Sequence, residues 1–197
     1  MYLTHPTGKG YTLRWMSAHG YFPLEDIVHI DPDHFKKLMP EWQGYLARSQ
    51  NAGDLTHRES GYLQEIAQEV ALGASQNIWV DGSLKDGAWF AEVFRDIRRR
   101  FPKYKLAIFH VSAPEDAVRE RVKKRAAASG RTIPEDLIQA SLRSVGDALE
   151  QLTPLVDFVA QLSNTRSTPE LLSFVKVDSS GDWGVIKKQF VHNMCDR

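Results

Sequence analysis

Three residues near the amino end, Gly8, Lys9 and Gly10, have the types and spacing best suited to chemistry in this chain. They lead into a predicted helix, and a glycine followed by a lysine at the start of a helix forms the second half of a phosphate-binding loop. In such a loop, backbone N–H groups surround the phosphates and the lysine bridges them. The complete loop reads G-x-x-x-x-G-K-S/T, so its first glycine falls on Leu3 and its Mg²⁺-binding hydroxyl falls on Gly10. The segment predicts a nucleotide-dependent phosphotransferase with a degenerate loop.

A pair of acids, Asp31 and Asp33, follows the first predicted strand, Ile27–Ile30. In open parallel sheets, ligands bind at the carboxyl ends of the strands, so residues that directly follow a strand are candidates for a site. A carboxylate there can take a proton from an attacking hydroxyl or bind Mg²⁺, and phosphoryl transfer uses both. The alternative is structural, because Asp33 can also cap a helix over His34–Met39.

A second polar group, Asp81, Ser83 and Lys85, follows the next predicted strand, Asn77–Val80. If the two strands are neighbours, Asp81 lies beside the first pair of acids, which favours a shared site. The alternative is a surface turn, because Asp-Gly is a common turn pair.

Basic side chains gather in a later predicted helix, at Arg121 and Arg125, and recur at Arg131. Helical spacing places Arg121 and Arg125 one turn apart, so both can approach one anion and neutralise charge on a transferred phosphate. A solvated helix face is the alternative. The histidines His29 and His57 have no third ligand at the spacing of a metal site, so the sequence predicts no zinc centre.

Short apolar runs alternate with longer segments of helical spacing, which is the pattern of a parallel sheet covered by helices on both faces. Two predicted helices each carry an apolar stripe that should cover the sheet. The stripe of the first comprises Leu63, Ile66, Ala67 and Val70, and that of the second comprises Phe90, Val93, Phe94 and Ile97. We expect a single α/β domain over the whole 197-residue chain, with the strand before Gly8 shortened or missing. The predicted strands are Ile27–Ile30, Asn77–Val80, Leu106–Val111, Phe158–Leu162 and Leu172–Val177.

Composition narrows the classes of partner. The chain carries 25 basic and 25 acidic side chains. This balance argues against a polyanion such as nucleic acid. No stretch of about 18 apolar residues would span a bilayer, and the single cysteine, Cys195, excludes an internal disulfide. We expect a cytoplasmic protein without a membrane contact.

These pieces together resemble the zeta-toxin family of P-loop kinases, from Gly8 to about Leu162. The resemblance implies a P-loop kinase fold and the binding of ATP with Mg²⁺. Toxins of this family transfer the γ-phosphate of ATP to a hydroxyl of UDP-N-acetylglucosamine, so it also implies a small-molecule acceptor. The matching pieces, in order, are Gly8-Lys9, Ile30-Asp31-Pro32-Asp33, Asp81-Gly82-Ser83-Leu84-Lys85, and Arg125 followed by Gly130-Arg131.

The resemblance also implies roles for individual residues. Lys9 would bridge the phosphates of ATP, with Gly8 and Gly10 around them, and Asp33 would be the catalytic base. Two arginines, Arg125 and Arg131, match those of the family's lid, which bind ATP and stabilise the charge of the transferred group. The residues that would contact the acceptor are Asp31, Glu59, Asp81, Ser83 and Lys85, and Asp81 would also position Mg²⁺.

The degenerate loop keeps two further hypotheses open. The first is a module of the same fold that has lost catalysis and binds a nucleotide or a protein, such as an antitoxin-like partner. The second is nucleic-acid binding through the arginine-rich segments, which would weaken steeply with salt.

Overall fold

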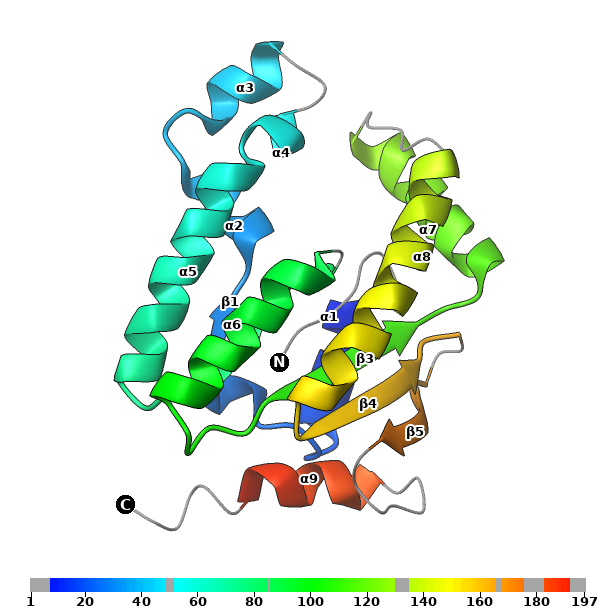
Figure 1. The fold of residues 1–197 in the computed structure, drawn as a ribbon. Helices are drawn as coiled ribbons and strands as arrows, with labels where there is room; N and C mark the ends of the chain where they lie inside the picture. Colours follow the sequence, from blue (N-terminus) through cyan, green and yellow to red (C-terminus); the bar gives the residue numbers. More distant parts are fainter. Residues whose placement is uncertain are drawn as a thin grey trace. The chain divides into compact units, whose positions relative to one another are not determined.

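Figure 1 shows the computed structural model of the chain, which describes residues 8–48, 52–84, 86–129, 135–165, 168–175 and 183–191. The chain forms two compact units. The larger unit comprises residues 1–26 and 83–197, and the smaller unit comprises residues 27–82. A single domain over residues 1–197 stays a prediction.

The larger unit is built on a three-stranded sheet of β3 (Ala107–Ser112), β4 (Phe158–Ser163) and β5 (Glu170–Val175). Strands β3 and β4 are parallel, as the sequence predicts, and β5 runs antiparallel to β4. The reason is the length of the connection, because a parallel neighbour needs a long crossover, whereas few residues separate β4 from β5. Each observed strand lies within two residues of its predicted position.

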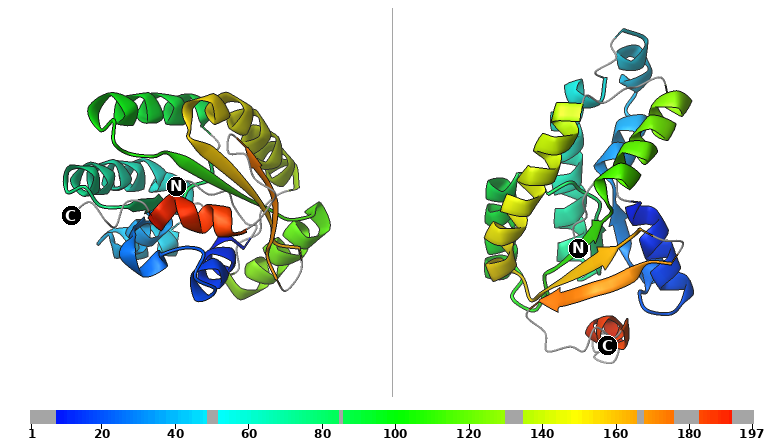
Figure 2. Two further views of the ribbon diagram at one scale, coloured as in Figure 1. Left: turned by 90° about the horizontal axis from the view of Figure 1, so that it is seen from below. Right: turned by 90° about the vertical axis from the view of Figure 1, so that its right-hand side faces the viewer.

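Helices cover both faces of this sheet. Helices α6 (Gly87–Arg100) and α8 (Glu135–Leu152) lie on one face, and α1 (Lys9–Ala18) lies on the other (Figure 2). Their apolar side chains are buried there, as the helical spacing predicts for Phe90, Phe94 and Ile97. The unit also contains η1 (Leu24–Asp26), α7 (Glu115–Ser129), η2 (Thr153–Leu155) and α9 (Trp183–Val191).

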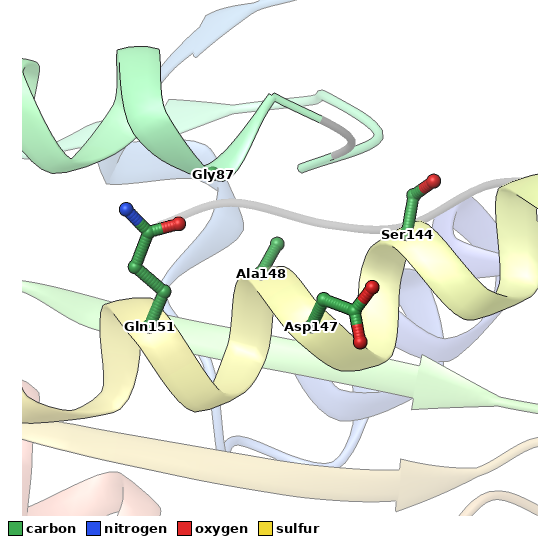
Figure 3. Close-up of a pocket in the computed structure, with 5 residues that line it drawn as sticks. All are labelled: Gly87, Ser144, Asp147, Ala148 and Gln151. Atoms are coloured by element: carbon green, nitrogen blue, oxygen red, sulfur yellow. The ribbon is translucent and has the colours of Figure 1, made fainter.

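The helices α6 and α8 approach each other closely at Gly87. A Cβ atom on Gly87 would lie 2.7 Å from Gln151 Oε1 and 3.1 Å from Ala148 Cα. Beside this contact is a shallow cavity of about 190 Å³, which Figure 3 shows with its lining residues. None of the residues that line it is among the predicted site residues. The glycine therefore serves helix packing.

The smaller unit pairs two short strands, β1 (Val28–Ile30) and β2 (Ile78–Val80), in parallel. Ile30 lies opposite Val80, and both side chains are almost fully buried. The condition for Asp81 to lie beside the first pair of acids, that these two strands are neighbours, is therefore met. The helices of this unit are α2 (Pro32–Leu38), α3 (Trp42–Arg48), α4 (Ala52–Leu55) and α5 (His57–Gly73).

The apolar stripe of α5 was predicted to cover the sheet, and this prediction is wrong, because the large side chains of the stripe are exposed. Ile66 and Val70 are 61% and 67% exposed, and the buried residues of α5 are instead Ser60, Gln64, Ala71 and Leu72. Helix α5 packs on α2, β1 and β2. Small side chains let it approach those elements closely, and helical periodicity does not show which face of a helix a neighbour covers.

This difference in burial can be tested by making the same substitution, isoleucine to valine, at an exposed position and at a buried one. Ile66→Val should change the free energy of unfolding by less than about 0.5 kcal/mol, because its side chain is mostly in solvent. Ile97→Val should cost about 0.5–1.5 kcal/mol, because Ile97 is 5% exposed. Chemical denaturation of both variants measures the two costs, and equal costs would contradict the orientation of α5.

Among the described residues, no helix combines the length and apolar character needed to cross a bilayer.

Candidate functional site

The amino end of α1 has the backbone geometry of an anion-binding turn. Gly8 precedes the helix with φ of +83° and makes no side-chain cap. Its carbonyl accepts hydrogen bonds from the amides of Tyr11 and Thr12, both at 3.1 Å, so the helix begins directly after it. The first amides of a helix have no acceptor within the helix and form its positive end, which attracts anions.

A side chain from the end of β4 holds this turn in place. The side chain of Asn164 donates from Nδ2 to the carbonyl of Gly8 at 3.4 Å. The backbone amide of Asn164 donates to the carbonyl of Ser112 of β3 at 2.9 Å. Arg121 of α7 donates from Nη2 to the carbonyl of Asn164 at 2.7 Å. The amino end of α1 is thus tied to β4 and to α7, all within the larger unit. No local pattern in the sequence indicates Asn164, because its contact with Gly8 spans 156 positions of the chain.

Two arginine side chains lie next to the same turn. The predicted Lys9 begins α1, and the guanidinium of Arg14 lies next to Gly10, with its Nη1 atom 3.3 Å from where a Cβ on Gly10 would be. Arg121 was predicted to share an anion with Arg125, and its Nη1 atom lies 3.6 Å from the Cβ position of Gly8. The sequence offered a signal for Arg14, which lies four residues after Gly10 and therefore one helical turn away.

Three of the predicted contributors lie wholly or partly outside the described part of the chain, and a fourth, Ser83, lies within it. Arg125 lies in α7, but its side chain is outside the described part of the chain, and Arg131 and Lys85 lie outside the described residues. Ser83 is half-buried and precedes Leu84, a buried residue with φ of +53°. A bulky residue in the left-handed region is strained, and such strain is common in loops that position functional groups.

The glycine at position 8 is required by two separate constraints. A Cβ there would lie 2.2 Å from Asn164 Nδ2, and the left-handed backbone penalises any side chain. Gly20 has a similar φ of +70°, but a Cβ there would meet nothing within 4 Å. The two glycines therefore separate the cost of the backbone conformation from the cost of the steric clash.

We expect Gly20→Ala to lower the free energy of unfolding by about 1–2 kcal/mol, which is the backbone cost alone. Gly8→Ala should cost more, because the new methyl group also displaces Asn164 from the turn. Adding Asn164→Ala to Gly8→Ala removes the clashing side chain. The extra loss of unfolding free energy in Gly8→Ala, compared with Gly20→Ala, should then become smaller. Urea denaturation measures all of these costs, and equal losses at the two glycines would show that Asn164 does not confine Gly8.

The acids after β1 have different partners from those predicted. Asp31, and not Asp33, caps α2: its Oδ1 atom accepts a hydrogen bond from the amide of Asp33 at 2.9 Å. The capping alternative for Asp33 is therefore wrong, because the helix begins at Pro32, one residue before it. The carboxylate of Asp33 is mostly exposed and pairs with Lys36 Nζ at 3.0 Å. Its charge is thus held at the start of α2 while much of its surface remains open to solvent.

Asp81 follows β2 and lies close to the end of β1. Its amide donates to the carbonyl of Ile30 at 2.8 Å, which extends the pairing of the two strands by one bond. His29 Nε2 lies 4.0 Å from Asp81 Oδ2. The ligand atoms of His29, Asp31 and Asp81 all lie within 4.8 Å of one another. Two carboxylates that could share a cation with His29 therefore lie beside it, which the sequence spacing does not reveal, because β1 and β2 are neighbours.

The remaining predicted acid, Glu59, lies in the exposed first turn of α5. Neither of the hydroxyl residues at the start of this helix, Thr56 and Ser60, caps it with its side chain. The hydroxyl of Thr56 donates to the carbonyl of Ala52 at 2.8 Å, and that of Ser60 donates to the carbonyl of His57 at 2.9 Å.

Comparison with known proteins supports the fold. The zeta toxin family profile matches residues 5–167 of the chain. A solved structure from the PezAT chromosomal toxin–antitoxin system of Streptococcus pneumoniae is 13% identical with a TM-score of 0.65, and the match covers 96% of this chain and 77% of that chain. A candidate kinase from Chloroflexus aurantiacus is 17% identical with a TM-score of 0.61, over 98% of this chain and 95% of that chain. No curated protein sequence matches the chain.

Proposed function

Because the chain belongs to the zeta toxin family, we propose that it is an ATP-dependent kinase that phosphorylates a hydroxyl of a nucleotide sugar such as UDP-N-acetylglucosamine. The observation that carries this proposal is the turn at the amino end of α1. Gly8 in the left-handed region, the helix amides and the guanidinium groups of Arg14 and Arg121 make a site suited to a polyphosphate, and Lys9 begins the same helix. The family resemblance supports the nucleotide sugar as the acceptor.

The proposed reaction transfers one phosphoryl group. The acceptor hydroxyl attacks the γ-phosphorus, the bond from that phosphorus to the β–γ bridging oxygen breaks, and ADP leaves with the bridging oxygen. Asp33 accepts the proton of the hydroxyl. Lys9 and the amides of α1 bind the phosphates, and the lid arginines Arg125 and Arg131 neutralise the charge that develops. The acceptor is held by Asp31, Glu59, Asp81, Ser83 and Lys85.

The residues at α1 do not supply the usual side-chain ligand for Mg²⁺. Gly10 stands where the loop motif has a hydroxyl. Thr12, the nearest hydroxyl along the helix, is fully buried, and its Oγ1 atom donates to the carbonyl of Gly8 at 3.4 Å. Protein ligands for a cation must therefore come from another part of the chain, and Asp81 is the predicted one. A bound Mg²⁺ would neutralise charge on the phosphates.

A non-catalytic module that binds a nucleotide or a protein is the second candidate function. The absence of a loop hydroxyl at Gly10 favours it, because the hydroxyl serves Mg²⁺ more than it serves phosphate binding. A protein partner of this module would be an antitoxin-like chain. The structure from Streptococcus pneumoniae comes from a toxin–antitoxin system, which supports that class of partner.

Phosphate transfer from radiolabelled ATP distinguishes the two functions. The chain is incubated with ATP labelled at the γ-position, Mg²⁺ and each of several UDP sugars, and the products are separated. We expect labelled UDP sugar and ADP in equal amounts, with neither formed when the acceptor is omitted. Binding of ATP without a labelled acceptor would contradict the kinase and support the module.

A further inference from the structure

We propose that His29, Asp31 and Asp81 form a binding site for a first-row transition-metal cation such as Mn²⁺, at the carboxyl ends of β1 and β2. The site lies wholly within the smaller unit, residues 27–82. It deepens the proposed function, because it assigns a cation and its ligands to a chain whose loop lacks the hydroxyl. All the contacts of the proposed site join residues of that unit.

Strand register places the three side chains on one face. His29 lies opposite Trp79 and Ile30 lies opposite Val80, so Asp31 and Asp81 occupy the next pair of positions. Side chains alternate between the two faces of a sheet, and paired residues of neighbouring strands point to the same face. His29 therefore shares its face with both acids, while Ile30 and Val80 point to the opposite, buried face.

The donor atoms have nearly the separations that one cation requires. An octahedral cation with ligand bonds of about 2.1 Å holds its donors about 3 Å apart when adjacent and about 4 Å apart when opposite. His29 Nε2 and Asp81 Oδ2 are 4.0 Å apart, and no pair among the three residues is separated by more than 4.8 Å. Small side-chain rotations bring all three onto one ion.

Neighbouring groups orient two of the ligands. The imidazole of His29 stacks on the buried indole of Trp79, with ring centroids 3.9 Å apart and an interplanar angle of 11°. The carboxylate of Asp31 is held through Oδ1 by the amide of Asp33. Such outer contacts fix the direction of metal ligands and raise the affinity of a site.

Charge and ligand type indicate which cation fits. Two carboxylates this close repel each other, and a divalent cation removes the repulsion. One imidazole nitrogen with two carboxylate oxygens suits Mn²⁺ and the later divalent ions of its row, whereas Mg²⁺ prefers oxygen ligands alone. The two acids alone would not discriminate between Mg²⁺ and Mn²⁺. His29 is therefore the residue that sets the preference for Mn²⁺.

Mn²⁺ binding to the full chain without nucleotide tests the site. Electron paramagnetic resonance measures free Mn²⁺ during a titration, and we expect one bound ion per chain that a tenfold excess of Mg²⁺ does not displace. His29→Phe keeps an aromatic ring against Trp79 and removes the ligand nitrogen. This variant and Asp81→Asn should each weaken binding at least about tenfold, the lower limit for loss of an outer partner. His57→Ala, which removes an exposed histidine in the first turn of α5, should bind as the unmodified chain does.

Two results would overturn the site: no Mn²⁺ binding by the unmodified chain, or equal binding by the unmodified chain, His29→Phe and Asp81→Asn. In the first case, an ion pair between protonated His29 and Asp81 explains their proximity. The proposed kinase reaction can fail separately from the metal site. If the chain binds Mn²⁺ but transfers no phosphate, the metal site stands and the kinase reaction is contradicted.

Discussion

Replacing Asp33 with asparagine is expected to lower the rate of phosphate transfer from ATP to the UDP sugar by about 10²- to 10⁴-fold. An amide cannot accept the proton of the attacking hydroxyl, and loss of a general base costs a factor of this size. The measurement is the initial rate of labelled acceptor formation at saturating ATP. Binding of ATP should change little, because the carboxylate acts on the acceptor.

The ion pair of Asp33 with Lys36 provides the matched control. Lys36→Met removes the same contact, which is 3.0 Å long, but leaves the carboxylate in place. If Asp33 is the base, Lys36→Met should retain most of the transfer rate. Equal losses in the two variants would show that the pair has only a structural role at the start of α2, and unchanged rates in both would remove Asp33 from catalysis.

Replacing Lys9 with methionine is expected to lower kcat/KM for ATP by about 10²- to 10³-fold. The side chain keeps nearly the same length, but the ammonium group that stabilises charge on the phosphates is lost. The helix start depends on Gly8 and its hydrogen bonds, so the fold should remain. Transfer rates at several ATP concentrations measure the ratio.

Lys188→Met is the matched control for Lys9, because Lys188 is an exposed lysine near the end of α9 and the substitution is the same. We expect its kcat/KM to equal that of the unmodified chain. A loss of less than about tenfold in Lys9→Met, compared with this control, would contradict phosphate binding at α1, since one lost charge-assisted contact is worth about 1.5–3 kcal/mol and about 1.4 kcal/mol is a factor of ten.

Much of the fold could be predicted from the sequence, because short apolar runs and helical spacing are local signals. All the predicted strands exist, and the α/β fold is confirmed. The orientation of α5 could not be predicted, because its apolar stripe at Ile66 and Val70 is exposed. Hydrophobic periodicity indicates that a helix has an apolar and a polar face. Which face of α5 is buried depends on its packing against α2, which periodicity does not show.

The candidate site was predictable only where its residues are neighbours in the sequence. Gly8 and Lys9 follow a motif, but the contact of Gly8 with Asn164 depends on where β4 ends. The meeting of His29 with Asp81 likewise depends on the pairing of β1 with β2. Such contacts join distant parts of the chain, so no local spacing reveals them. The roles of the predicted site residues stay predictions.

The most direct test of the central claim is a crystal structure of the chain with a non-hydrolysable ATP analogue. We predict density for the β- and γ-phosphates at the amides of Gly8, Lys9 and Gly10, with Lys9 Nζ within hydrogen-bonding distance of a phosphate oxygen. Density for the phosphates elsewhere in the molecule, with these three amides facing only solvent, would contradict the proposal that the amino end of α1 binds the nucleotide.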